Sequence, residues 1–127
     1  MQAMTQQINK SCLRCNKNTW HVESNNITHP PKYLIILVNR FSYIDGGFMK
    51  SECPIPINLK VELGPYKFSL QAIIDHHGSR MSSGHYTSSI SCCGKLFVCN
   101  DITITEKQLL TTLYSSTAYI ILYRLIT

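Results

Sequence analysis

Residues 84–101 read GHYTSSISCCGKLFVCND, and this stretch decides how the chain folds. Two strand-like runs flank the pair Cys93-Gly94, which stands where a two-residue hairpin loop belongs. A loop of that length places Thr87 opposite Asn100, with His85 two residues along on the same face and within reach of the amide. The stretch therefore predicts an antiparallel hairpin that brings an imidazole close to an amide.

An imidazole beside an amide can serve in catalysis. A histidine that acts as a general base keeps one ring nitrogen free toward a nucleophile, while an amide or carboxylate on the other nitrogen fixes its tautomer and orientation. Asn100 or its neighbour Asp101 could orient His85 in this way. The alternative is an ordinary strand-edge histidine followed by an ordinary turn. The bare residues favour that alternative, because histidine and asparagine are common near hairpins, and a three-residue loop would turn Asn100 away.

Strand patterns dominate the rest of the chain. The continuous apolar run Tyr33–Val38 is typical of a strand buried on both faces. Cys53–Ile57 is extended, but its two prolines remove ladder donors and exclude it from the centre of a sheet. One short helix is predicted over Thr105–Leu113, where Thr105 can cap and three leucines share a face. Further strands are expected at residues 19–22, 66–74, 86–91, 96–99 and 118–125. The predicted fold class is therefore α+β, mainly antiparallel β.

A polar segment bracketed by glycines, Asp75–Gly84, leads directly into His85. Segments of this composition rearrange at little cost, and substrates are often bound there. We therefore expect a loop that contacts a substrate. A plain surface loop is the alternative.

Composition limits the classes of function. The chain has 127 residues, enough for one domain, with 44% apolar and 15% charged residues. Its net charge of +5 comes from basic residues scattered between Lys10 and Arg124, so nucleic-acid binding is not expected. The apolar runs are too short to span a bilayer, and Met1–Met4 resembles no leader. We expect a cytoplasmic or nuclear protein that does not bind membranes.

The six cysteines indicate reduced thiols or a metal rather than disulfides, because no signal peptide is apparent. Cys12 and Cys15 have the gap with which both thiolates of a knuckle bind one tetrahedral zinc ion, but one pair is half a site. Two surface cysteines near a terminus are an equal alternative. The adjacent pair Cys92 and Cys93 is most simply part of a turn and a strand edge.

The order of the motifs is more informative than any one of them. The chain carries a Cys-x-x-Cys pair, an apolar strand ending in Asn-Arg-Phe, a strand followed by His-His-Gly, then Gly-His-Tyr-Thr, Cys-Asn-Asp and a last apolar strand. These motifs stand at residues 12–15, 31–41, 70–78, 84–87, 99–101 and 118–123. Together they closely resemble the C-terminal part of the ubiquitin-specific protease family over nearly the whole chain.

The resemblance implies a catalytic site. His85 matches the family's catalytic histidine, which takes the proton from a cysteine thiol so that the thiolate can attack the carbonyl at the C-terminus of ubiquitin. Asn100 matches the third member of that triad, and Asp101 matches the acidic neighbour that the family often keeps. The segment His77–Gly84 matches a mobile segment that closes over the tail of ubiquitin. Substrate contacts are expected at His77, Gly78, Ser83, Gly84 and Tyr86.

The resemblance also implies an architecture, the palm and fingers half of a papain-like cysteine protease domain. Residues 1–28 match part of the zinc-bearing fingers, with Cys12 and Cys15 as the second knuckle, and residues 29–127 match the palm. The family's nucleophile, first knuckle and helical thumb lie upstream of the matching region, and no cysteine here stands in the nucleophile's context. We therefore expect no cofactor for catalysis and a structural zinc ion of which this chain holds half the site.

The implied partners are ubiquitin or a ubiquitinated protein, together with a separate N-terminal thumb fragment. The chain is then the histidine-bearing part of a deubiquitinating cysteine protease that is inactive alone. A second hypothesis is a non-catalytic ubiquitin-binding module derived from such an enzyme. A third is a small zinc-dependent interaction domain built on Cys12 and Cys15.

Overall fold

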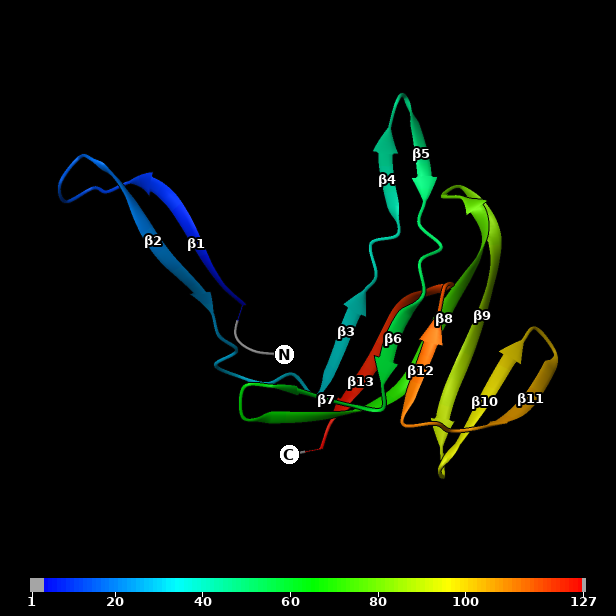
Figure 1. Cartoon of the computed structure of the whole chain (residues 1–127). Coiled ribbons are helices and arrows are strands. Elements are labelled where there is room, and N and C mark those ends of the chain that lie inside the picture. Colours follow the sequence, from blue (N-terminus) through cyan, green and yellow to red (C-terminus); the bar gives the residue numbers. More distant parts are fainter. Residues whose placement is uncertain (1–3, 127) are drawn as a thin grey trace.

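The computed structural model describes residues 4–126, which form thirteen β-strands. A twisted antiparallel sheet of seven strands dominates the molecule (Figure 1). The strands are β1 (Met4–Ser11), β2 (Asn18–Asn25), β3 (Tyr33–Leu37), β4 (Phe41–Ile44), β5 (Gly47–Lys50), β6 (Ile55–Asn58), β7 (Lys60–Leu63), β8 (Tyr66–Arg80), β9 (Ser83–Cys92), β10 (Lys95–Asn100), β11 (Thr103–Gln108), β12 (Thr112–Ser115) and β13 (Ala118–Leu125).

The large sheet has the order β11-β10-β9-β8-β13-β3, and β7 also pairs with β8. The long strand β8 therefore holds the centre, with β9 on one side and β13 on the other. The pairs β1–β2, β4–β5 and β6–β12 form three separate two-stranded ribbons. The antiparallel architecture that the sequence predicts is confirmed. The Pro-containing segment also behaves as predicted, because among the strands of residues 4–126 β6 pairs with β12 alone, outside the large sheet.

The β9–β10 hairpin has the predicted register. Cys92 pairs with Lys95 and Cys99 pairs with Ser88, so Cys93 and Gly94 form a two-residue loop. Both loop residues have positive φ, 52° and 75°, as a type I′ turn requires. This register puts the end of β10 beside the start of β9, where His85 lies.

The hydrophobic core lies between the large sheet and the β6–β12 ribbon. Strands β8 and β13 contribute most of its side chains, and Ile57 of β6 covers them. Phe68 is fully buried, which stabilises the fold by about 1.5–3 kcal/mol relative to an exposed side chain. The hydroxyl of Tyr123 donates a 2.8 Å hydrogen bond to the carbonyl oxygen of Asn58 and ties the two layers together. Burial raises the pKa of Tyr123, so this hydroxyl stays a donor.

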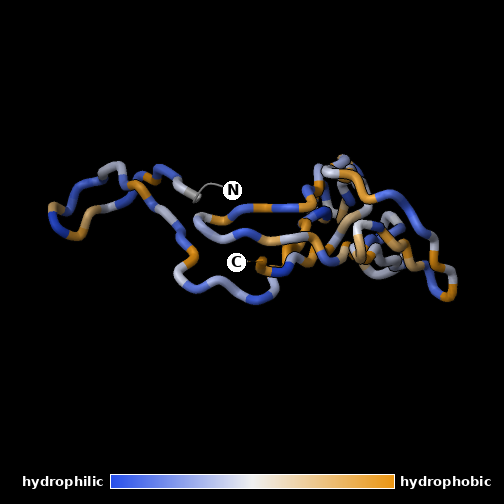
Figure 2. The backbone as a smooth tube through the Cα atoms, turned by 90° about the horizontal axis from the view of Figure 1, so that it is seen from below, coloured by the Kyte–Doolittle hydropathy of each residue, from blue (hydrophilic) through white to orange (hydrophobic). Residues whose placement is uncertain are grey.

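The β1–β2 ribbon stands apart from the rest of the molecule (Figure 1). Seen along the perpendicular direction, it still extends away from the sheet (Figure 2). Its eight cross-strand pairs run from Met4 with Asn25 to Ser11 with Asn18. Trp20 and Val22 are exposed on one face of it. Isolated two-stranded ribbons are marginally stable in water, so a ligand or metal ion that binds this arm would increase its stability.

The prediction of a helix over Thr105–Leu113 is wrong. The segment forms β11, which adds to the edge of the sheet through β10, and then β12, which pairs with β6. The three leucines share a helical face in sequence, but pairing with neighbouring strands overrides that local pattern. No helix occurs between residues 4 and 126, and hence none there that is long and apolar enough to cross a membrane.

Two further expectations need correction. The run at Tyr33 is not buried on both faces, because β3 is an edge strand on which Ile35 and Leu37 are 67% and 61% exposed. The expected loop over Asp75–Gly84 is wrong too, since β8 continues to Arg80 and β9 begins at Ser83. These strands can consist of polar residues because their side chains are solvated. The strands are held together by main-chain hydrogen bonds, which do not depend on apolar side chains.

Candidate active site

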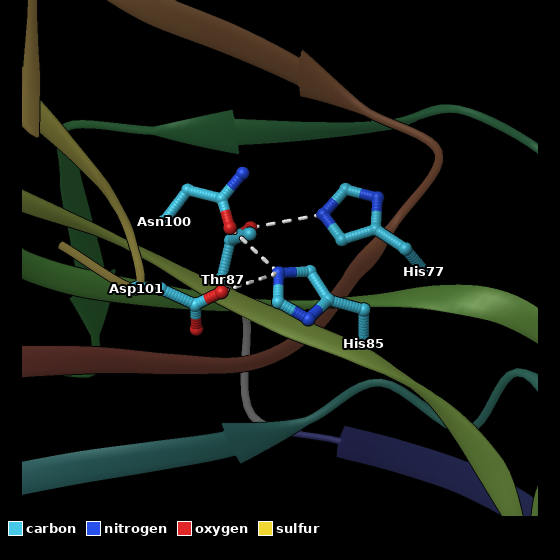
Figure 3. Close-up of polar contacts among 5 residues, drawn as sticks. All are labelled: His77, His85, Thr87, Asn100 and Asp101. Carbon is cyan, nitrogen blue, oxygen red and sulfur yellow. Dashed lines mark hydrogen bonds and ion pairs between the residues drawn. The ribbon is translucent and has the colours of Figure 1, made fainter. Parts of the chain in front are cut away.

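His85 and Asn100 lie side by side across the β9–β10 hairpin. The ring nitrogen Nε2 of His85 is 2.6 Å from the side-chain oxygen Oδ1 of Asn100 (Figure 3). An amide oxygen only accepts hydrogen bonds, so Nε2 carries the proton and donates. The other ring nitrogen, Nδ1, is therefore the unprotonated atom of the neutral ring. The geometry leaves a base at Nδ1 and an orienting amide at Nε2.

Asp101 approaches the same nitrogen less closely. Its carboxylate oxygen Oδ2 is 4.0 Å from Nε2 of His85, and its side chain is largely exposed. At that distance, in contact with solvent, an ion pair contributes about 0–1 kcal/mol. Asp101 has a φ of 50°, so the chain turns sharply after β10, and this turn carries the carboxylate back toward the ring. Asn100 is the primary partner, and Asp101 adds negative charge nearby.

His77 occupies the neighbouring position on the same face. It is the cross-strand partner of His85, and the two ring centroids are 6.3 Å apart. Its Nε2 lies 2.9 Å from the hydroxyl oxygen of Thr87, two residues beyond His85 (Figure 3). The Thr87 contact fixes the orientation of His77 on the exposed surface. Two imidazoles and one amide therefore share a single surface.

The other residues expected to contact a substrate divide between two places. Gly78 and Ser83 lie at the end of the β8–β9 hairpin, where the register shifts between His77 and Arg80. A Cβ added to Gly78 would lie 3.1 Å from the Cα of Gly84, and its φ of 130° suits glycine. The two strands approach closely there. The tip itself, at Arg80, lines a hollow together with Met81, Ser82 and Phe48 of β5.

Tyr86 points to the opposite face from His85, because it pairs with His76. Its ring centroid is 4.9 Å from that of His76, and about half of the Tyr86 side chain is exposed. Tyr86 therefore packs beneath the hairpin and does not share the surface of His77 and His85.

His76 is a residue that the sequence reasoning missed. It is 2% exposed, surrounded by the rings of Phe41, Tyr86 and Tyr119, and neither ring nitrogen has a hydrogen-bond partner. Burial lowers its pKa, and the nearby positive charge of Lys50 adds to that effect. The doublet His76-His77 could have predicted a buried histidine, because adjacent side chains of a strand point to opposite faces and one of the two faces the interior.

Lys50 was also missed. Its ammonium nitrogen is 2.5 Å from the carbonyl oxygen of His76 and 2.8 Å from that of Gly78. It therefore ties the end of β5 to the backbone on either side of His77. No local sequence signal marks this contact, since the partners are 26 and 28 residues away.

Cys12 and Cys15 lie in the turn between β1 and β2. The amide of Asn16 donates a 2.8 Å hydrogen bond to the carbonyl oxygen of Cys12, and Asn16 has a φ of 53°. Hydrogen bonds from the backbone of Arg14 and then of Cys15 lower the pKa of the Cys12 thiol. A stabilised thiolate is the form that binds zinc. Within residues 4–126, however, no group of three or more suitable side chains surrounds the pair.

The comparisons with known proteins agree with one another. The model of the family described as ubiquitin carboxyl-terminal hydrolase matches residues 2–123. Ubiquitin carboxyl-terminal hydrolase 17-like protein D of Mus musculus is 28% identical over 120 residues, covering 88% of this chain and 22% of its own length. Ubiquitin carboxyl-terminal hydrolase 21 of Homo sapiens is 29% identical over 126 residues, a match that covers 90% of this chain and 21% of that protein. This chain thus spans about a fifth of these relatives.

Solved structures show the same fold. A chain of the SAGA Ubp8/Sgf11/Sus1/Sgf73 DUB module bound to ubiquitin aldehyde aligns with a TM-score of 0.67 and 18% identity, covering 98% of this chain and 32% of that one. A second structure of the SAGA Ubp8/Sgf11/Sus1/Sgf73 DUB module aligns with a TM-score of 0.68 and 17% identity, covering 96% of this chain and 28% of that one. The resemblance to ubiquitin-specific proteases in the sequence is confirmed. Because the family model covers residues 2–123, this chain belongs to the ubiquitin carboxyl-terminal hydrolase family.

Proposed function

We propose that this chain supplies the general base of a cysteine-type deubiquitinase, with His85 as the base and Asn100 as its orienting partner. The observation that supports this most strongly is the 2.6 Å contact between Nε2 of His85 and Oδ1 of Asn100. It fixes the tautomer in which Nδ1 is free, and the side chain of His85 is about half exposed, so a thiol can reach it. The family membership supports the C-terminal carbonyl of ubiquitin as the proposed substrate.

The chemistry then follows from the two ring nitrogens. Nδ1 of His85 takes the proton of a cysteine thiol, and the thiolate attacks the carbonyl carbon. The ring is positively charged at this stage, and the amide oxygen of Asn100 and the carboxylate of Asp101 both favour that charge. Nδ1 then gives its proton to the departing amine, which leaves an acyl-enzyme for water to hydrolyse. Asp101 contributes charge through space, whereas Asn100 holds the ring.

We further propose that the nucleophile lies on a segment outside residues 1–127. The cysteine sulfurs of the described residues form their hydrogen bonds elsewhere, as in Cys99 with the carbonyl oxygen of Phe97 and Cys92 with Cys93. A general base must lie within hydrogen-bond reach of the proton that it takes. The chain alone is therefore inactive, and a thumb segment from the same or another polypeptide completes the site. The tail of ubiquitin would lie beside His77 and the β8–β9 tip.

Zinc binding at Cys12 and Cys15 is a related proposal. The turn and the backbone hydrogen bonds to the Cys12 sulfur suit a knuckle that holds two of four ligands. Zinc bound there would fix the tip of the β1–β2 arm and supplies no catalytic chemistry. Metal analysis of the complex with a thumb segment should find zinc, which a Cys12→Ser variant loses. The matched Cys53→Ser variant should retain it.

A fluorogenic ubiquitin C-terminal amide tests the catalytic proposal. The pure chain should show no turnover, and turnover should appear when a family thumb segment with its cysteine is added. In that complex, His85→Ala should reduce turnover by about 10²–10⁴-fold, the usual contribution of a general base. Turnover by the chain alone that is lost on changing one of its six cysteines would overturn the proposal.

A non-catalytic ubiquitin-binding module is the second candidate. The exposed side chain of His77 and the hollow lined by Phe48 favour it, since binding at either place requires no nucleophile. Titration of the labelled chain with ubiquitin should shift amide resonances of the β8–β9 tip. Such shifts together with no turnover after thumb addition would favour the binding module over the enzyme.

A further inference from the structure

The turn of the β9–β10 hairpin holds two thiols in contact. The sulfur atoms of Cys92 and Cys93 are 3.4 Å apart, and both residues are exposed. Adjacent side chains of a regular strand point to opposite faces, so neighbouring thiols do not normally meet. Here the strand ends at Cys92, and the turn brings the two sulfurs to one side. The contact is a product of the turn geometry.

The backbone at Cys93 is unusual for its residue type. Four non-glycine residues of the described chain have positive φ, and the other three are Asn16, Asp45 and Asp101. Asparagine, aspartate and glycine are the residues that tolerate this region, and they dominate the type I′ turn. Cysteine at φ 52° therefore carries local strain that asparagine would avoid. A strained position occupied by a reactive side chain is a candidate functional site.

The separation of the sulfurs is close to the one that a bridge through a single atom needs. A disulfide requires about 2.05 Å between its sulfurs, well below the 3.4 Å found here. Two thiolates at about 2.3 Å from one tetrahedral metal ion lie roughly 3.8 Å apart. The observed separation is much nearer to that of sulfurs joined through one heavier atom. A bridging atom can therefore enter without a large rearrangement of the turn.

We propose that Cys92 and Cys93 form a binding site for thiophilic electrophiles of the trivalent arsenical class, in which one arsenic atom bridges both sulfurs. Both S–H bonds and both arsenic–oxygen bonds of an aryl arsonous acid break, and two arsenic–sulfur bonds form. The two thiol protons leave with the two oxygens as water. No atom changes its oxidation state, so no oxidant is needed.

The contact between the two thiols favours the protonated form of Cys92. The hydrogen bond between the two thiols raises the pKa of Cys92, and the charge of Cys93 acts in the same direction. The site is a hairpin tip, where a bound ligand meets no other element of the sheet.

Phenylarsine oxide is the probe, and intact mass spectrometry is the readout. Because Cys12 and Cys15 form a second close pair, the test begins with the Cys12→Ser/Cys15→Ser variant of the full chain. This variant should retain one phenylarsenic unit in the presence of excess glutathione, a monothiol, and lose it on addition of dimercaptopropanol, a dithiol. Adding Cys93→Asn should abolish retention, with at least a 10-fold loss of apparent affinity.

Two controls separate the site from the rest of the chain. Asparagine suits the positive φ of residue 93, so this variant should melt at the same temperature or higher, which excludes unfolding as the cause of the loss. Replacing Cys53 and Cys99 by serine in the same background should leave arsenic binding unchanged. Retention of arsenic by the Cys93→Asn variant, or its absence when only Cys12 and Cys15 are replaced, would overturn the proposal.

Discussion

His85 and Asn100 meet through a 2.6 Å contact between Nε2 and Oδ1, whereas the carboxylate of Asp101 stays 4.0 Å from the same nitrogen. We predict that Asn100→Ala removes the preference for the Nε2-protonated tautomer, because no other acceptor lies as close. Asp101→Ala should leave that preference in place. Long-range ¹⁵N–¹H NMR of the two ring nitrogens measures the tautomer directly, without requiring turnover. Equal changes in both variants would contradict the assignment of Asn100 as the primary partner.

The position of Gly84, directly before His85, gives a second prediction. A Cβ there would collide with the ring of His76 and the carbonyl oxygen of His77. Gly84→Ala should therefore destabilise the chain by about 1–3 kcal/mol, as overpacking does. Gly47→Ala is the matched control, since nothing lies within 4 Å of its added Cβ. Urea denaturation measures the free energy of unfolding of both variants. Equal values would contradict the prediction, because they would mean that β8 and β9 make room for the added methyl group at no energetic cost.

The buried imidazole of His76 should make stability depend on pH. Burial and the charge of Lys50 lower its pKa in the folded state, while His77, also adjacent, acts in the same direction. The unfolded chain then binds more protons at acid pH, so stability is complete above the unfolded pKa of about 6.5 and falls as pH decreases below it. The slope from this one group is at most about 1.4 kcal/mol per pH unit.

Denaturation from pH 8 to pH 5 measures that slope. His76→Leu removes the titrating ring, so the loss of stability below pH 6.5 should become smaller even if the absolute stability changes. The matched His77→Leu variant removes only the smallest of these influences on His76, so it should change the slope less than His76→Leu does. An unchanged slope in His76→Leu would assign the acid sensitivity to other groups.

Arg40 gives a prediction about the fold. Its guanidinium is 3% exposed and donates hydrogen bonds to the carbonyl oxygens of Ser51, Cys53, Ser115 and Ala118, at 2.6–3.0 Å. Arg40→Met would leave the buried carbonyl oxygen of Ala118 and three partly buried ones without their donor, at a cost of roughly 1–3 kcal/mol for each one that water cannot reach. Thermal denaturation should show a large loss, or no folded protein. Arg124→Met on the exposed side of β13 should change stability by less than about 0.5 kcal/mol.

The sequence predicted the elements whose causes are local. The Cys93-Gly94 pair specified a two-residue type I′ turn. A loop of that length allows one register between the two flanking strands, and in that register His85 lies close to Asn100. The motif order predicted the family. The helix over Thr105–Leu113 failed since three leucines on one helical face are also compatible with strands, and only the neighbouring strands β10 and β6 decide between them.

The contacts around the site could not be predicted, because their partners are distant in sequence. Arg40 meets Ala118 across 78 residues, and Lys50 reaches His76 across 26. Neither side chain has a pattern that distinguishes it from a solvated one. His76 differs, since its adjacency to His77 in a strand implied that one ring points inward, yet which one depends on the register of β8 against β9.

The outward face of β3 has a practical consequence. Ile35 and Leu37 project from β3, which pairs with β13 alone among the described strands, so exposed apolar side chains lie at the open border of the sheet. Two copies of the polypeptide can join along that border into a continuous ladder. Preparations at high concentration will therefore tend to self-associate, and a lysine in place of Ile35 is the simplest change that keeps them monodisperse.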